Sequence, residues 1–89
     1  MFIVVSYDII ENRRRSRLHR ALKNFGSWVQ YSVFECVLEP KDFSRLQATV
    51  QPVLKRGDHV RYYRLCEHCE RQVIVIGGTV TQPSRTLVI

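Results

Sequence analysis

The pattern of apolar and polar positions predicts short strands alternating with two amphipathic helices along this 89-residue chain. The first apolar run, residues 2–7, is typical of a buried strand. Apolar side chains then recur at the spacing of one helical face, which predicts a helix with Asn12 as its N-cap and Gly26 at its end. The apolar stripe of this helix consists of Leu18, Ala21, Leu22 and Phe25.

Residues 28–38 are rich in valine and aromatic residues and roughly alternate between apolar and polar positions. The stretch is too long for one ordinary strand, so we expect two strands with a tight break near Tyr31 and Ser32. Pro40 then fits the first turn of a second helix. The apolar stripe of that helix consists of Phe43, Leu46, Val50, Val53 and Leu54.

Pro52 lies inside this second stripe and is expected to kink or fray the last helical turn before Gly57 closes it. Residues 58–65 predict a fourth strand, and residues 72–76 predict a fifth. The candidate packing residues of the fourth strand are Val60, Tyr62 and Tyr63. We therefore expect one domain over residues 1–78, which ends in the Gly77-Gly78 break. A tail over residues 79–89 follows, in which residues 86–89 fit a short strand.

The element order β-α-β-β-α-β, with an extra C-terminal strand, is the ferredoxin-like arrangement of the α+β class. Because crossover connections are right-handed, we expect both helices on one face of an antiparallel sheet. The opposite face is then open, which in so small a protein favours a homodimer. The extra strand would extend the edge of the partner's sheet.

The formal net charge of +6 and the pI of about 9.7 favour nucleic acid as a partner. No apolar stretch approaches the ~20 residues of a membrane span, so we expect no membrane partner. The first apolar residues lack the basic segment and cleavage site of a signal peptide. An odd number of cysteines without such a signal favours the reducing cytoplasm.

Asp8 follows the first apolar run and stands where the strand leaves the core. On this residue alone, a helix-capping or turn-forming role is favoured, because aspartate is common in such turns. The alternative is a magnesium ligand, although a single carboxylate is a poor magnesium site. A homodimer would remove this objection, because its twofold axis can bring two copies of Asp8 together. Glu11 and Glu35 are further candidate acids.

Arg13, Arg14, Arg15 and Arg17 cluster at the start of the first predicted helix. Each cation there opposes the helix dipole at a cost of roughly 0.3–1 kcal/mol at low salt. A phosphate bound at that end would reverse the balance. A solvated basic face is the common alternative, but the position favours phosphate binding.

Tyr7 is expected on the face opposite Asp8, because side chains alternate along a strand. The candidates for stacking on bases are Tyr31, Phe34, Tyr62 and Tyr63. For Phe34, core packing is the stronger alternative. The signature of an RNA recognition motif is absent, although the topology is similar.

Cys66 and Cys69 form a C-x2-C pair, which can hold zinc. Structural zinc needs four ligands, and the other cysteine and histidines supply no recognisable second pair. Free cysteines in a turn are therefore favoured. Neither a P-loop nor a dinucleotide-binding glycine motif is present.

Four segments of the chain together resemble the CRISPR-associated protein 2 family. They are Tyr7-Asp8-Ile9, the basic helix start from Asn12 to Arg17, Gln30-Tyr31-Ser32-Val33-Phe34-Glu35, and Asp58-His59-Val60-Arg61-Tyr62-Tyr63-Arg64-Leu65. The resemblance spans residues 1–76, and its strength comes from the order of all four segments in a basic chain of this length. Trp28 departs from the pattern, because some members carry an arginine there. The cysteine pair and the tail after Gly78 are not part of the pattern.

This resemblance implies a ferredoxin-like homodimer in which the fifth strand adds to the partner's sheet. It also implies a metal-dependent phosphodiester hydrolase, an endonuclease that uses Mg²⁺ or Mn²⁺ on single-stranded RNA in some members and double-stranded DNA in others. Asp8 matches the catalytic, metal-binding aspartate. The predicted nucleic-acid-binding residues are Tyr7, Arg13, Arg14, Arg15, Arg17 and Phe34.

The family implies a second role in spacer acquisition, as a bridge that holds DNA between two dimers of the CRISPR integrase. Nuclease chemistry need not operate in that role. The alternative to an endonuclease is therefore a non-enzymatic DNA-binding scaffold. The two hypotheses differ in whether Asp8 is required.

Overall fold

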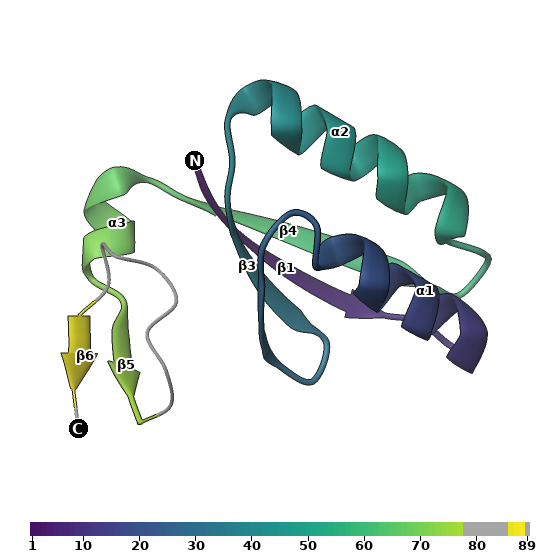
Figure 1. Ribbon diagram of the computed structural model, residues 1–89, viewed down its shortest axis with the longest axis horizontal. Helices are drawn as coiled ribbons and strands as arrows, with labels where there is room; N and C mark the ends of the chain where they lie inside the picture. Colours follow the sequence, from purple (N-terminus) through teal and green to yellow (C-terminus); the bar gives the residue numbers. More distant parts are fainter. Residues whose placement is uncertain (78–85, 89) are drawn as a thin grey trace.

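The computed structural model describes residues 1–77 and 86–88, and it confirms the predicted α+β, ferredoxin-like architecture (Figure 1). All neighbouring strands of the four-stranded sheet are antiparallel. The strands in spatial order are β2 (Ser27–Gln30), β3 (Val33–Val37), β1 (Phe2–Asp8) and β4 (His59–Leu65). This order places β1, and the acid at its end, in the middle of the sheet.

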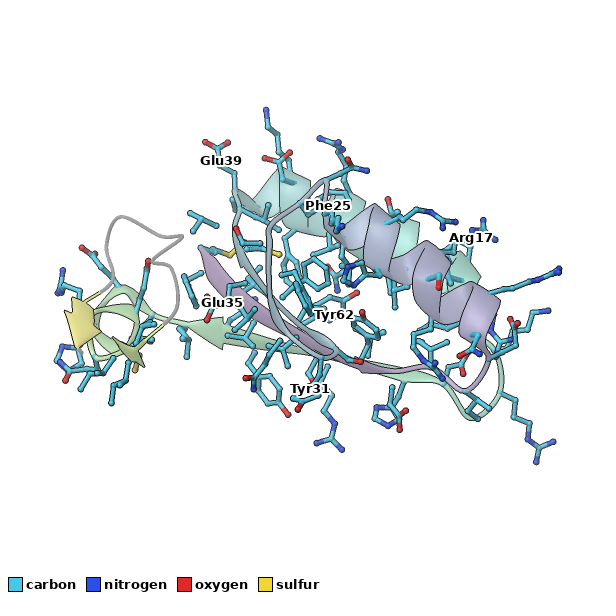
Figure 2. The ribbon with its side chains drawn as sticks, turned by 60° about the horizontal axis from the view of Figure 1, so that its bottom comes forward. Arg17, Phe25, Tyr31, Glu35, Glu39 and Tyr62 are labelled. Carbon is cyan, nitrogen blue, oxygen red and sulfur yellow. The ribbon has the colours of Figure 1, made fainter. Side chains whose placement is uncertain are left out.

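Helices α1 (Asn12–Leu22) and α2 (Pro40–Val50) cover one face of the sheet, as the right-handed crossovers predicted (Figures 1 and 2). The core between the two layers is built from side chains that are fully buried. Each buried aliphatic or aromatic side chain contributes about 1.5–3 kcal/mol relative to an exposed one. The residues at 0% exposure are Ile3, Val5, Leu18, Leu22, Phe34, Cys36 and Leu46.

The start of α1 differs from the prediction, because Glu11 and not Asn12 is the N-cap. The Glu11 carboxylate accepts hydrogen bonds from the backbone N–H groups of Arg13 and Arg14, at 3.1 and 3.2 Å. The bond from Arg13 is the main cause of the lowered pKa of Glu11. A negative charge at this position also offsets part of the unfavourable arginine charge.

The helix ends at Leu22, with Lys23 as its C-cap, and so stops earlier than the predicted Gly26. Gly26 has a different function, which is to let the chain pass close to β3. A Cβ atom at Gly26 would lie 2.3 Å from the backbone oxygen of Glu35 and 2.5 Å from Sγ of Cys36. Only glycine fits this approach without a shift of the strand.

The break predicted near Tyr31 and Ser32 is confirmed as the tight turn between β2 and β3. Tyr31 adopts a left-handed backbone conformation with φ of 42°. The indole Nε1–H of Trp28 donates a hydrogen bond to the backbone oxygen of Tyr31 at 2.8 Å and so fastens the turn. A tyrosine in this conformation is uncommon and is held here by its neighbours.

Pro40 occupies the first turn of α2, as predicted. Pro52 does not continue the helix but lies in a single 3₁₀ turn, η1 (Gln51–Val53). The backbone then turns at Gly57, with φ of 91°, and enters β4. Val60 and Tyr62 of β4 pack against the core as predicted, whereas Tyr63 on the other face is half-exposed.

After β4 the chain forms a short helix, α3 (Glu67–Arg71), where the sequence predicted only a turn. The fifth strand is present as β5 (Ile74–Ile76), which is shorter than predicted. It pairs in parallel with β6 (Thr86–Val88), and both lie outside the four-stranded sheet (Figure 1). The predicted domain boundary between residues 78 and 79 falls outside the described residues and stays a prediction.

Over residues 1–77 and 86–88, no helix has the length and apolar character that crossing a membrane requires.

Candidate nucleic-acid interface

Asp8 is the last residue of β1, and its side chain is 75% exposed. Its cross-strand neighbour is His59, whose Nε2 lies 3.6 Å from Oδ2 of the Asp8 carboxylate. Because Glu11 caps α1, the alternative that Asp8 caps this helix is wrong. The fold therefore leaves this carboxylate available to a ligand.

Strand alternation places Asp8 on the open face of the sheet. Phe2 and Val4 lie on the same face of β1 as Asp8, because they are separated from it by an even number of residues. Their cross-strand partners, Val37 on β3 and Tyr63 on β4, therefore lie on that face as well. Tyr7 points to the opposite, helix-covered side, as predicted, and is 5% exposed. The acid and the half-exposed apolar side chains thus share one surface, which we call the open face.

The described residues contain no group of three histidine, cysteine or acidic side chains close enough to hold a metal ion. Glu11 is engaged as a helix cap, and Glu35 pairs with Val4, about 13 Å along β1 from Asp8 at ~3.3 Å per residue. Mg²⁺ is often bound by one or two carboxylates together with water and substrate phosphate. Of the three predicted acids, Asp8 is therefore the one that could offer a carboxylate to such an ion, and the metal site stays a prediction.

Arg14 and Arg15, two of the predicted phosphate contacts, bind other parts of the protein. Arg14 donates to the Asp58 carboxylate from Nε at 3.0 Å and from Nη2 at 3.3 Å. Arg15 donates to the backbone oxygen of Ile9 from Nε at 3.1 Å and from Nη2 at 2.9 Å, and to the side-chain oxygen of Asn12. Both arginines therefore hold the start of α1 against the end of β1 and the turn before β4.

Asp58 is the acceptor at the centre of this arrangement, and its side chain is 0% exposed. It also accepts hydrogen bonds from the backbone N–H groups of Ile10 and Lys55, each at 2.9 Å. The hydrogen bond from Arg14, reinforced by these two, lowers the pKa of Asp58 to about 2. Sequence reasoning missed this role, since Arg14 and Ile10, two of its three partners, lie more than 40 residues away along the chain.

Arg13, Arg17 and Arg20 lie on one exposed face of α1, because their spacing of four and three residues brings them together. With Asn12 and Ser16 they line a hollow of about 380 Å³. Figure 2 shows Arg17 on the outer surface of the helix. Within the described residues none of the three arginines forms an ion pair. We call these three residues the α1 basic face.

Arg20 was not among the predicted contacts, although its spacing from Arg13 and Arg17 was a signal that could have identified it. Phe34 is 0% exposed and lies with Tyr7 in the core, their ring centroids 6.4 Å apart. A ring so enclosed has no exposed face for a base, which favours core packing for Phe34. The direct contact of these residues with nucleic acid stays a prediction.

All three cysteines are free thiols. Cys36 is buried, and burial raises the pKa of its thiol to about 11. Cys66 and Cys69 are exposed at the start of α3, where the backbone N–H of Cys69 lies 3.3 Å from Sγ of Cys66.

Comparison with known proteins gives a consistent result. Residues 1–73 match the family model described as CRISPR associated protein Cas2. The CRISPR-associated endoribonuclease Cas2 3 of Chloroflexus aurantiacus is 37% identical, over 99% of this chain and 98% of that protein. A protein of the same name from Synechocystis is 36% identical, over the full length of both chains.

The solved structures agree with the sequence matches. The crystal structure of Streptococcus pyogenes Cas2 superposes with a TM-score of 0.74 at 26% identity, over 86% of this chain and all of that one. A protein of Thermus thermophilus described as hypothetical superposes with a TM-score of 0.70 at 36% identity, over 73% of this chain and 80% of its own. The fold and these matches show that the chain belongs to the Cas2 family of CRISPR-associated proteins.

Proposed function

We propose that this protein is a metal-dependent endonuclease of the CRISPR adaptation machinery that hydrolyses phosphodiester bonds in RNA. The observation that carries the proposal is the exposed Asp8 carboxylate, whose one ion-pairing partner among the described residues is His59. The relatives at 37% and 36% identity are named endoribonucleases, which supports RNA as the substrate.

The open face supports a homodimer in which two Asp8 carboxylates together hold Mg²⁺ or Mn²⁺. Such an ion, when bound, supplies stabilisation of phosphate charge and an activated water. The chain itself supplies the negative charge that attracts the ion and the cationic surface that binds the strand. Arg13, Arg17 and Arg20 would neutralise backbone phosphates and so make binding depend on salt.

A second candidate function is a non-enzymatic scaffold that binds double-stranded DNA and bridges two integrase dimers. It is favoured by a contrast within the described residues. There the three exposed arginines of the α1 basic face form no ion pair, whereas Asp8 is the one predicted acid left available to a metal. In this case the basic face is required for spacer insertion and Asp8 is not.

One pair of variants separates the two functions. We expect Asp8→Asn to lower metal-dependent RNA cleavage at least about 100-fold, since several kcal/mol of charge stabilisation depend on the metal. RNA binding should remain within twofold, because the fold does not use this carboxylate. Glu39→Gln removes an exposed charge at the start of α2 and is the matched control.

The second variant is Arg13→Gln/Arg17→Gln/Arg20→Gln, with Lys41→Gln/Arg45→Gln/Arg71→Gln as its charge-matched control. Each phosphate contact contributes roughly 0.9 to the slope of log affinity against log salt concentration. We therefore expect the loss of three contacts to make this slope for duplex DNA shallower by about 2–3. Full cleavage by rigorously purified Asp8→Asn protein would overturn the nuclease proposal. Spacer insertion that survives Asp8→Asn but not the triple variant would establish the scaffold instead.

A further inference from the structure

A second hollow, of about 310 Å³, lies between α1 and the turn that joins β2 to β3. It shares Ser16 and Arg20 with the hollow of the α1 basic face, so the two are adjacent. We call it the hairpin pocket. Its lining consists of Tyr7, Arg15, Ser16, His19, Arg20, Tyr31 and Ser32.

The inner part of the pocket is polar and fixed in place. The hydroxyl of Tyr7 lies 3.2 Å from Nδ1 of His19. The His19 ring packs edge-on against Phe34 and Trp28, with centroids 5.0 and 5.7 Å away. Tyr7 and His19 thus place a hydroxyl and an imidazole ring at the inner wall of the pocket.

The outer edge of the pocket combines a free aromatic ring with cations. Tyr31 is 85% exposed, although its backbone is fastened by the hydrogen bond from Trp28. Core packing therefore does not explain the tyrosine ring at this turn. Arg15 is fixed by its bonds to Ile9, whereas Arg20 has no ion pair in the described part of the chain.

A ligand for this pocket must be a small flat ring with a hydrogen-bonding edge and a negative charge next to it. Pockets that bind small molecules begin at roughly 300 Å³, so this one has room for a single ring system and not for a duplex. Unpaired bases bind proteins by stacking on aromatic rings and by hydrogen bonds to their edges. In a duplex, the faces of each base are stacked on neighbouring bases and its pairing edge is bonded to the opposite strand, so neither is open to the protein.

We propose that the hairpin pocket binds one unpaired nucleobase of a strand whose phosphates lie along the α1 basic face. The Tyr31 ring stacks on the base, the hydroxyls of Tyr7, Ser16 and Ser32 face its edge, and Arg20 neutralises the phosphate between the two hollows. This inference rests on the proposed nucleic-acid-binding function and adds the place on the protein where one base of the strand is held.

The test uses Tyr31→Asn, because asparagine tolerates the left-handed backbone and so preserves the turn. Tyr31→Phe is the matched variant that keeps the ring. The probes are an eight-residue oligouridylate, the same ribose-phosphate chain without bases, and a duplex RNA. Affinities are measured by calorimetry at one fixed salt concentration, and circular dichroism confirms that each variant is folded.

We expect Tyr31→Asn to weaken oligouridylate binding about 5- to 100-fold, which corresponds to the loss of one stacked base. Binding of the base-free chain and of duplex RNA should change less than twofold, and Tyr31→Phe should behave as wild type. A second variant, Ser32→Leu, fills the pocket from the turn at a residue that does not line the hollow of the α1 basic face, and it should have the same selective effect.

Two outcomes would overturn this inference. If Tyr31→Asn binds oligouridylate as tightly as wild type, the pocket takes no base, although nucleic-acid binding stands. If all three probes weaken equally, Tyr31 contributes a general surface contact and the pocket assignment is wrong. Failure of the wild-type protein to bind any probe would instead refute the proposed function itself.

Discussion

Asp8 and Asp58 lie at the same end of the sheet, because Asp8 is the cross-strand neighbour of His59 and Asp58 directly precedes His59 in the chain. The two carboxylates nevertheless differ in their exposure and in their hydrogen bonds. Asp8 is 75% exposed, whereas Asp58 is enclosed by hydrogen-bond donors from Arg14, Ile10 and Lys55. A carboxylate with several donors belongs to the structure, and one without them is available for chemistry. This contrast is the main reason to assign the site to Asp8.

Asp58→Asn should lower the melting temperature at pH 7, because an amide cannot replace an ionised acceptor of the Arg14 guanidinium. The folded pKa of about 2 lies below the ordinary 3.8, so the charge stabilises the fold above about pH 4. This contribution is lost as the pH falls through that interval towards 2. The difference in melting temperature between the variant and the wild type should therefore become smaller as the pH falls from 4 to 2.

The measurement is thermal unfolding followed by circular dichroism from pH 2 to pH 7. Asp42→Asn is the control, since Asp42 is paired with the exposed Arg45 on the surface of α2. If both substitutions lowered the melting temperature equally, or if the difference between Asp58→Asn and the wild type did not change with pH, the Asp58 charge would not be the cause of the stabilisation.

The sequence identified Asp8 but not Asp58, for a physical reason. A polar residue directly after an apolar run is a local signal, and it was visible without any tertiary information. The donors of Asp58 include Arg14 and Ile10, which lie 44 and 48 residues away. Only the fold, which brings the start of α1 next to the turn before β4, places them together. The same reason explains why Arg14 was predicted to contact phosphate.

Among the elements, those with long apolar periodicity were predicted well, whereas their ends and the short helix α3 were not. Helix α3 spans five residues, none of them buried, so it leaves no apolar stripe in the sequence. The cap of α1 was missed because the carboxylate of Glu11 reaches two N–H groups from a position where asparagine is more usual. Both features depend on local hydrogen bonds, which periodicity does not reveal.

The loop between α1 and β2 should be sensitive to a single added methyl group. We expect Gly26→Ala to lower the free energy of unfolding by about 1–3 kcal/mol, because the new Cβ would collide with backbone of β3. Urea unfolding at neutral pH provides the measurement. Ser27→Ala, at the adjacent position, is the control, and a loss below about 0.5 kcal/mol for Gly26→Ala would contradict the close approach.

At the scale of the whole molecule, the two faces of the sheet differ. The helices cover one face, while the open face presents Val37 and Tyr63, which are 56% and 48% exposed. Asp8 lies on that same face, so an association that covers these apolar side chains also brings two copies of Asp8 onto one interface. The homodimer and the metal site are therefore one hypothesis.

Sedimentation tests this hypothesis directly. The wild-type protein should be a dimer at micromolar concentration, and Val37→Asp should weaken the dimer at least tenfold by placing an unpaired charge in the interface. Ile10→Asp, at another exposed apolar position, is the control. A wild-type protein that remains a monomer at 100-fold higher concentration would remove the basis for a shared metal.

The hydrogen bond that Trp28 makes to the turn has a practical consequence. Trp28 is the only tryptophan in the sequence, and its indole contacts both the Tyr31 backbone and the His19 ring. Tryptophan fluorescence of the protein therefore reports on one place alone, the surroundings of the turn at Tyr31 and of the His19 ring. A ligand that enters beside His19 can be followed in real time with the unlabelled protein.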